Sequence, residues 1–167
     1  MEIVASNLTV DLRWREADIA IRNFRPTEPD LVARRIRDDR ARLYASEAYL
    51  ARIGSPRSPA DLLRADFIGF DATDTMLRGL NALGLSLTRR NFPVLTGSHL
   101  VHWELVKAGI GIGVVPESLG DATPGVRQVL PELAPLVFPI WPTSHRELRT
   151  SRRVRLVFDM LAEALAV

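Results

Sequence analysis

The sequence predicts an α/β fold, and three features of the chain predict it. The clearest is residues 96–118 (TGSHLVHWELVKAGIGIGVVPES), where a helical segment runs directly into an apolar, strand-like one. Strand-like and helical segments also alternate along the rest of the chain, as in a sheet that packs against helices. The chain has 167 residues, of which 47% are hydrophobic and 25% charged, so one domain can bury a substantial core.

Residues 96–118 carry signals for both ends of the helix. Ser98 follows Gly97 and can accept a hydrogen bond from an N–H of the first turn, and Gly109 is a typical helix end. Residues 110–115 are apolar with interleaved glycines, and they predict a strand that is buried on both faces and ends at Pro116. The glycines would allow another segment to approach this backbone closely.

The N-terminal half predicts further strands and helices in turn. Strands are expected at 2–6 and 17–22, with a helix capped by Asn7 between them. Residues 31–45 are read as extended, and 46–54 as a short helix that Ser46 caps and Gly54 closes. Asp38 and Asp39 break the basic run within 31–45, so a solvated strand surface is favoured over a nucleic-acid patch.

The C-terminal half continues the alternation. The expected elements are a strand at 67–71, a helix at 75–83, short extended pieces at 85–90 and 93–95, a loop at 117–125, a strand at 136–141 and an amphipathic helix at 151–166. Pro139 interrupts the strand at 136–141, which favours an edge or crossing position for it. The arginines at the start of the last helix are expected to form a solvated face.

Two places in this arrangement predict ligand contacts. Arg22 ends the strand at 17–22, and ligands of open α/β sheets bind outside the carboxyl ends of strands, so Arg22 is a candidate anion-binding residue. The alternative is a surface arginine paired with Asp or Glu. Ser98 and His99 begin a helix, where anions are favoured, although Ser98 can also act only as a cap. Thr73, between Asp71 and Asp74, either caps the next helix or faces a ligand.

Signatures of catalysis and of cofactors are missing from the sequence. There is no G-x-S-x-G motif, no Walker motif and no cysteine. The glycines 109, 111 and 113 lie inside the predicted strand rather than between a strand and a helix, so they do not indicate dinucleotide binding. A site built from His99, His102 and His145 is disfavoured because no further ligand is well placed, so no metal and no cofactor are expected.

Four segments resemble, in the expected order, the effector-binding domain of LysR-type transcriptional regulators. They are ADIAIR at 17–22, the long segment at 31–62, VKAGIGIGVVPES at 106–118 and WPTSHRELRTSRRVRLVFDML at 141–161. The resemblance extends from Glu2 to Leu165. It implies a two-lobed, periplasmic-binding-protein-like (type 2) fold with two crossing strands, in which residues 1–38 and 139–167 form lobe one and residues 39–138 form lobe two. It further implies that the first strand and helix of lobe one, and the DNA-binding domain, are missing from this sequence.

By the same resemblance the chain is a sensor of a small-molecule effector (co-inducer), and not an enzyme. The effector would be an organic acid or aromatic metabolite, most simply an anion, bound in the cleft between the lobes. The carried-over ligand-binding residues are Arg22, Asn23, Thr73, Gly97, Ser98, His99 and Trp141. A homodimer is expected, with DNA contacted only through an N-terminal winged helix-turn-helix, no membrane contact and a cytoplasmic location. The alternatives are a stand-alone solute-binding protein of similar architecture and an α/β enzyme without a recognisable signature.

Overall fold

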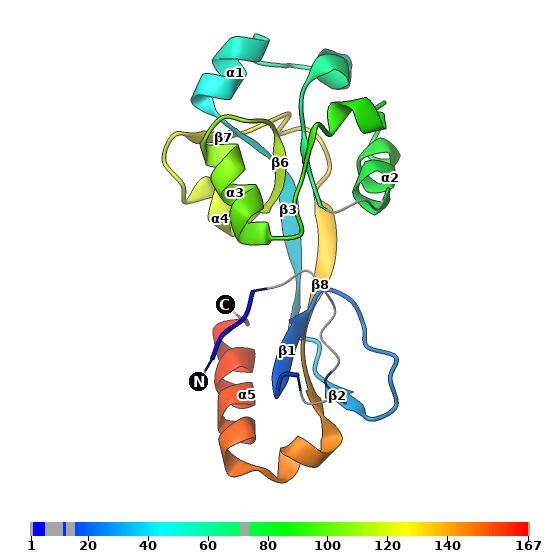
Figure 1. Ribbon diagram of the computed structural model, residues 1–167, viewed down its shortest axis with the longest axis vertical. Helices are drawn as coiled ribbons and strands as arrows, with labels where there is room; N and C mark the ends of the chain where they lie inside the picture. The colour runs from blue at the N-terminus through cyan, green and yellow to red at the C-terminus, as the bar shows by residue number, and fades with distance from the viewer. Residues whose placement is uncertain (1, 6–11, 13–15, 71–73, 167) are drawn as a thin grey trace. The chain divides into compact units, whose positions relative to one another are not determined.

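The computed structural model describes residues 2–5, 12, 16–70 and 74–166, and these divide into two compact units (Figure 1). Unit 1 comprises residues 1–8 and 40–136, and unit 2 comprises residues 9–39 and 137–167. The chain passes from unit 2 to unit 1 inside β3 (Arg37–Ser46) and returns at the start of β8 (Leu136–His145), which are both ten residues long. The two predicted crossing strands are therefore present. The lobe boundaries given by the resemblance stay a prediction.

Unit 1 is built around β3. Two strands, β6 (Gly113–Pro116) and β7 (Val126–Gln128), pair with it antiparallel, so that Tyr44 lies opposite Gly113 on one side and Gln128 on the other. A separate parallel pair joins β4 (Ile68–Gly69) to β5 (Val94–Leu95). The helices are α1 (Glu47–Ile53), η2 (Pro59–Arg64), α2 (Thr75–Ala82), η3 (Arg89–Asn91), α3 (His99–Lys107) and α4 (Glu117–Asp121).

The hydrophobic core of unit 1 draws on segments that are distant in the sequence. Its buried members include Leu43, Tyr49, Leu62, Phe67, Leu80, Leu85, Ile112 and Val129. Phe67 and Ile112, both fully buried, form a parallel bridge that ties the start of β4 to the segment before β6. The burial of these apolar side chains is the main force that holds the short elements together.

Unit 2 is built around the part of β8 that follows residue 136. Two strands pair antiparallel with it, β1 (Ile19–Arg22) and β2 (Leu31–Ala33), and Ser144 lies opposite a residue of each. The backbone bonds from Arg34 N–H to the Pro142 carbonyl and from Ile36 N–H to the Ile140 carbonyl extend the second pairing. After β8 come η4 (Arg146–Thr150) and α5 (Arg152–Ala164). Every helix in the described ranges is too short or too polar to span a lipid bilayer.

The predicted helix ends are confirmed at α1 and α3. The Ser46 hydroxyl accepts a hydrogen bond from Tyr49 N–H, and Gly54 ends α1 with φ of 87°. The Ser98 hydroxyl accepts from Val101 N–H, and Gly109 follows α3 with φ of 74°. A positive φ is costly for residues with a Cβ, so both glycines are required where they stand.

Several predicted strands are shorter than expected or missing. Residues 2–5 do not form a strand, and their side chains are exposed, with Ile3 82% and Val4 72% accessible. Of the strand predicted at 67–71, Ile68 and Gly69 form β4, and residue 71 lies outside the described residues. Arg89 and Arg90, at the end of the extended piece expected at 85–90, belong to η3. The strand after α3 begins at Gly113 rather than residue 110, because Ile110 N–H still bonds the Leu105 carbonyl of the helix.

Two other predictions need correction. The expected loop at 117–125 contains α4, where Gly120 lies against the Tyr44 ring so closely that a Cβ would fall 2.4 Å from it. The strand expected at 136–141 continues to His145, because β1 and β2 both pair with its second half. Asn7, most of the segment that it was expected to cap (8–11 and 13–15), and Thr73 lie outside the described residues.

Candidate functional site

Arg22 and Trp141 form the part of the predicted site that lies in unit 2. They are directly paired residues of the antiparallel strands β1 and β8. Side chains of such a pair point to the same face of a sheet, with Cβ atoms about 5 Å apart. The fold therefore directs the Arg22 and Trp141 side chains to the same face of the sheet, at the carboxyl end of β1. Asn23 is exposed in the bend that follows.

The Arg22 guanidinium is buried and ion-paired. Its side chain is 5% exposed, and Nη1 donates to Glu28 Oε1 at 2.8 Å. Its guanidinium carbon also lies 5.4 Å from the centroid of the Phe24 ring, within the range of a cation–π contact. The hydrogen bond from Arg22 is the largest of the influences that lower the pKa of Glu28. The Glu28 carboxylate is therefore ionised at neutral pH.

The Trp141 indole carries a buried donor without an acceptor. Its Nε1 is inaccessible to solvent, and no hydrogen-bond partner for it occurs among the described residues. An unsatisfied buried donor costs about 1–3 kcal/mol, so such groups are uncommon and call for an explanation. An acceptor supplied by a ligand is one explanation that the chemistry allows.

Gly97, Ser98 and His99 form the part of the predicted site that lies in unit 1. Ser98 caps α3, and its own N–H donates to the Thr96 hydroxyl at 3.2 Å. Gly97 is exposed, and a Cβ added there would meet nothing within 4 Å. The first turn of α3 thus presents a capped helix start beside open space, where the helix dipole favours negative charge.

The sequence did not reveal that Phe70 lies beside this helix start. Its ring centroid is 4.4 Å from that of His99 and 4.3 Å from that of His102, with which it is stacked. His99 is exposed, yet its contact with Phe70 removes part of its hydration, and this burial lowers its pKa. The site therefore presents a neutral imidazole at pH 7.

His102 has a structural role. It is 2% exposed, and its Nε2 lies 3.1 Å from the Ile68 carbonyl, to which the neutral ring donates. Burial is the main cause that lowers its pKa to about 4, while the bond to Ile68 opposes that shift. Among the described residues there is no cluster of three metal-ligating side chains. The absence of a metal and of a cofactor stays a prediction.

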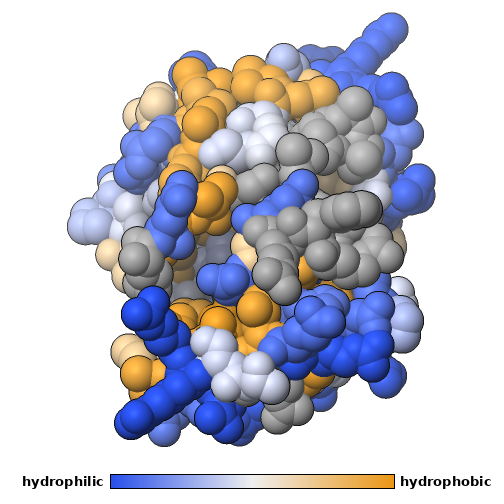
Figure 2. Space-filling model, turned by 60° about the horizontal axis from the view of Figure 1, so that its bottom comes forward, coloured by the Kyte–Doolittle hydropathy of each residue, from blue (hydrophilic) through white to orange (hydrophobic). Residues whose placement is uncertain are grey.

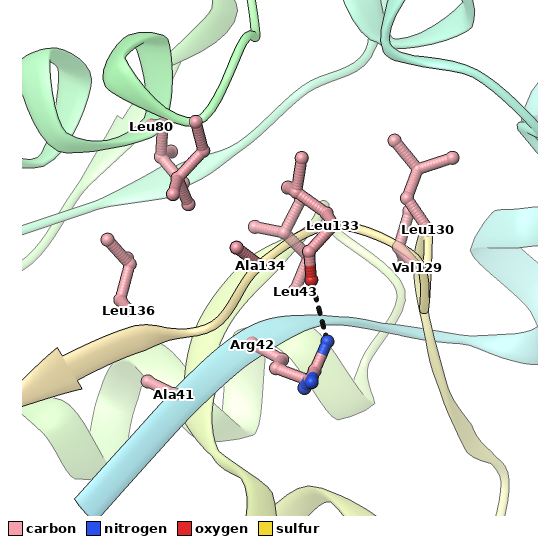
Figure 3. Close-up of a pocket in the computed structure, with 10 residues that line it drawn as sticks. Ala41, Arg42, Leu43, Leu80, Val129, Leu130, Leu133, Ala134 and Leu136 are labelled. Carbon is pink, nitrogen blue, oxygen red and sulfur yellow. Dashed lines mark hydrogen bonds between the residues drawn. The ribbon is translucent and has the colours of Figure 1, made fainter.

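A pocket in unit 1 lies apart from all the predicted site residues. It is a shallow hollow of about 230 Å³, a volume that includes open solvent, between β3, α2 and the segment before β8 (Figure 3). Its lining is apolar except for Arg42, whose Nη1 donates to the Leu133 and Pro131 carbonyls while its Nε donates to Glu117. These bonds hold the guanidinium at the edge of the pocket, so the pocket is a gap in apolar packing rather than an anion site.

Exposed apolar side chains do not single out a further site. Large ones occur in both units, among them Leu100 (65% exposed) and Leu156 (62%). Figure 2 shows hydrophobic residues lying between hydrophilic ones on one face of the molecule. Scattered exposure of this kind is ordinary for folded proteins.

The comparisons with known proteins agree with the fold. The family model of the LysR substrate binding domain matches residues 2–166. The HTH-type transcriptional regulator CrgA of Neisseria meningitidis serogroup C (strain 8013) is 27% identical over 175 residues, which cover 99% of this chain. The chain spans only 57% of the length of that regulator.

Solved structures agree with the family match. The regulatory domain of CrgA superposes with a TM-score of 0.78 at 26% identity, covering 93% of this chain and 79% of that one. The AmpR effector binding domain from Citrobacter freundii superposes with a TM-score of 0.75, covering 95% of this chain and 80% of that one, and at 18% identity it shows the fold alone. The chain therefore belongs to the LysR substrate-binding domain family, and it is a regulatory domain of the periplasmic-binding-protein-like type, not an enzyme.

Proposed function

We propose that this domain binds a small anionic metabolite, an organic or aromatic acid, in a cleft between its two lobes, and that it is the effector sensor of a LysR-type regulator. The observation that carries the proposal is the pairing of Arg22 with Trp141. A buried positive charge and an unsatisfied N–H on one face are complementary to a carboxylate, which accepts several hydrogen bonds.

The helix start in unit 1 supports the same ligand class. Ser98 and Gly97 offer a hydroxyl and open space at the positive end of α3, and Phe70 with His99 offers ring surface for an aromatic part of the ligand. Thr73 and Asn23 remain further candidates from the resemblance. A ligand that prefers one arrangement of the lobes would shift the population toward that arrangement, which is how a sensor of this kind transmits a signal.

The longer protein's partners belong to the same proposal. DNA binding through a separate helix-turn-helix domain, a homodimer and a cytoplasmic location follow from the family resemblance. The family match favours the regulator over the stand-alone solute-binding protein that the sequence left open.

Thermal melts of the chain with a panel of small carboxylates and aromatic acids test the proposal. A ligand at 100 times its Kd adds about 2.7 kcal/mol of stability when it binds only the native state. Trp141→Phe removes the N–H and keeps an aromatic ring. Because a hydrogen bond to a charged group contributes about 1.5–3 kcal/mol, we expect it to weaken binding at least tenfold.

Trp103→Phe is the matched control, since Trp103 is a half-buried indole on α3 and its nitrogen is not among the unsatisfied buried atoms. We expect that variant to bind as the parent does. Equal loss of affinity in both variants, or none in Trp141→Phe, would exclude the indole from the site. Failure of every carboxylate to shift the melt would argue against an anionic effector.

A further inference from the structure

Glu28 places a carboxylate of the protein on the guanidinium that the proposed function assigns to the ligand. Its Oε1 accepts from Arg22 Nη1 at 2.8 Å, which is the geometry expected for a bound organic acid. The two partners differ in burial, because the Arg22 side chain is 5% exposed and the Glu28 side chain 30%. Glu28 is therefore the more accessible partner of the pair.

The position of Glu28 in the loop allows it to leave without disturbing the sheet. It lies only six residues after Arg22, in the connection between β1 and β2. Its second oxygen, Oε2, accepts from the neighbouring Thr27 N–H at 2.9 Å, and its carbonyl accepts from Leu31 N–H at 3.2 Å. The side-chain bonds can break by rotation of Glu28 alone, while the backbone bond keeps the loop closed.

A buried arginine needs a negative partner in every state of the protein. Leaving such a charge unpaired costs several kcal/mol, so ligand-free protein must supply an anion of its own. Glu28 meets that requirement. A ligand carboxylate that took its place would leave the number of charges at Arg22 unchanged, whereas a neutral ligand would replace the charge-assisted hydrogen bond with a weaker, neutral one.

We propose that Glu28 is an internal competitor of the effector: it occupies Arg22 in the ligand-free domain, and the ligand's carboxylate displaces it. The inference rests on the proposed function and adds its regulation. Each binding event must break the Arg22–Glu28 pair, so that pair weakens the apparent affinity and raises the effector concentration at which the domain responds. It also gives specificity, because a carboxylate can replace Glu28 and an uncharged amide cannot.

The test is a comparison of the parent with Glu28→Gln, using acetate as the minimal carboxylate probe and acetamide as its neutral counterpart. The glutamine keeps the size and an acceptor oxygen of the glutamate but loses its charge, and a cooperative thermal melt checks that the variant is folded under the titration conditions. Binding is followed through the indole N–H resonance of Trp141, assigned with Trp141→Phe, while sodium chloride keeps the ionic strength constant. We expect Glu28→Gln to bind acetate about tenfold more tightly than the parent, with acetamide bound by neither protein.

Asp30→Asn is the matched control. Asp30 lies at the end of the same loop and pairs with Arg146, so its substitution changes the net charge equally and leaves the Arg22–Glu28 pair in place. We expect Asp30→Asn to bind acetate with the parent's affinity. An equal gain of acetate affinity in Asp30→Asn and Glu28→Gln would mean that the net charge alone causes the gain, and it would overturn the inference.

Two other outcomes separate this inference from the proposed function. Equal acetate midpoints in the parent and Glu28→Gln would mean that the carboxylate binds without displacing Glu28, so the competitor is refuted and the anion site stands. No saturable shift in either protein up to about 1 M acetate would refute the anion site itself, and the competitor with it.

Discussion

Substitution of Gly113 by alanine tests the packing that holds the unit-1 part of the site. An ideal Cβ at Gly113 would lie 2.4 Å from Val106 Cγ2 and 2.5 Å from His102 Cε1, far inside van der Waals contact. Neither neighbour can yield easily, since Val106 is fully buried and His102 is held by the Ile68 carbonyl and the Phe70 ring. The added methyl group must therefore displace His102 or the β6 backbone.

The expected cost follows from opposing effects. Overpacking a well-filled core costs about 1–3 kcal/mol, and a displaced His102 also weakens a hydrogen bond worth about 1 kcal/mol. Replacing glycine by alanine also reduces the conformational entropy of the unfolded chain, which stabilises the folded state by about 0.4–1 kcal/mol. We expect Gly113→Ala to lower the free energy of unfolding by about 1–3 kcal/mol, which for a chain of this size lowers Tm by about 3–10 °C.

Gly79→Ala is the matched control for this measurement. Gly79 lies inside α2, and a Cβ there would meet only Leu136 Cδ2, at an ordinary contact distance of 3.7 Å. Alanine is preferred over glycine within a helix by about 1 kcal/mol, so this variant should gain stability. Urea denaturation followed by circular dichroism measures both. If Gly113→Ala unfolded at the parent's midpoint while Gly79→Ala gained stability, the close packing around His102 would be wrong.

Two further predictions concern side chains of unit 1. The pKa of His102 is about 4 in the folded state and near 6.5 when unfolded, so the unfolded chain binds more protons between these pH values. We therefore expect the free energy of unfolding to fall by up to about 3 kcal/mol from pH 6.5 to 4. In His102→Gln, the urea midpoint should depend less on pH across this range. Tyr49→Phe should lower the free energy of unfolding by about 1–3 kcal/mol, because the hydroxyl accepts from Asp66 N–H at 2.7 Å and donates to the Asp66 carbonyl at 3.2 Å. Tyr44→Phe should lower it less, because the Tyr44 hydroxyl bonds the solvent-exposed Asp121 carboxylate. The reverse order in urea titrations would contradict the argument.

Helix ends were the part of the fold that sequence predicted best. Ser46 and Ser98 cap α1 and α3, and Gly54 and Gly109 follow them with positive φ. Each signal is local, since a cap involves only the few residues around a helix end. Four neighbouring residues are enough to read it.

Strand limits were predicted less well because pairing joins distant segments. The strand after α3 begins only where Tyr44 of β3 provides a partner for Gly113, although residues 110–112 are equally apolar. β8 continues past Pro139 and Pro142 because β1 and β2 pair with its second half, and the Pro142 carbonyl accepts from Arg34 N–H. Neither register can be read from the segment itself.

The candidate site was likewise predictable where the signal is local and not where it depends on tertiary contacts. The position of Arg22 at a strand exit follows from a rule about sheets, and the start of α3 from a rule about helices. The contacts of Phe70 with two histidines, and the pairing of Trp141 with Arg22 across β8 and β1, depend on tertiary contacts that composition and spacing do not encode. The charge of Glu28 in the following loop was visible, but its pairing with Arg22 was one of several possibilities.

The sequence left two interpretations of Arg22 open, an anion-binding residue or an arginine paired with a carboxylate, and the structure makes them compatible. An arginine that is 5% exposed needs a counter-charge whether or not a ligand is bound, so an internal pair in the ligand-free protein does not argue against an anion site. The relevant observation is the exposure of its partner. The Glu28 side chain is 30% exposed, so solvent reaches the carboxylate that pairs with Arg22. The Glu28 carboxylate can therefore be replaced at Arg22 by a carboxylate from solution, and the proposed sensor function requires such an exchange.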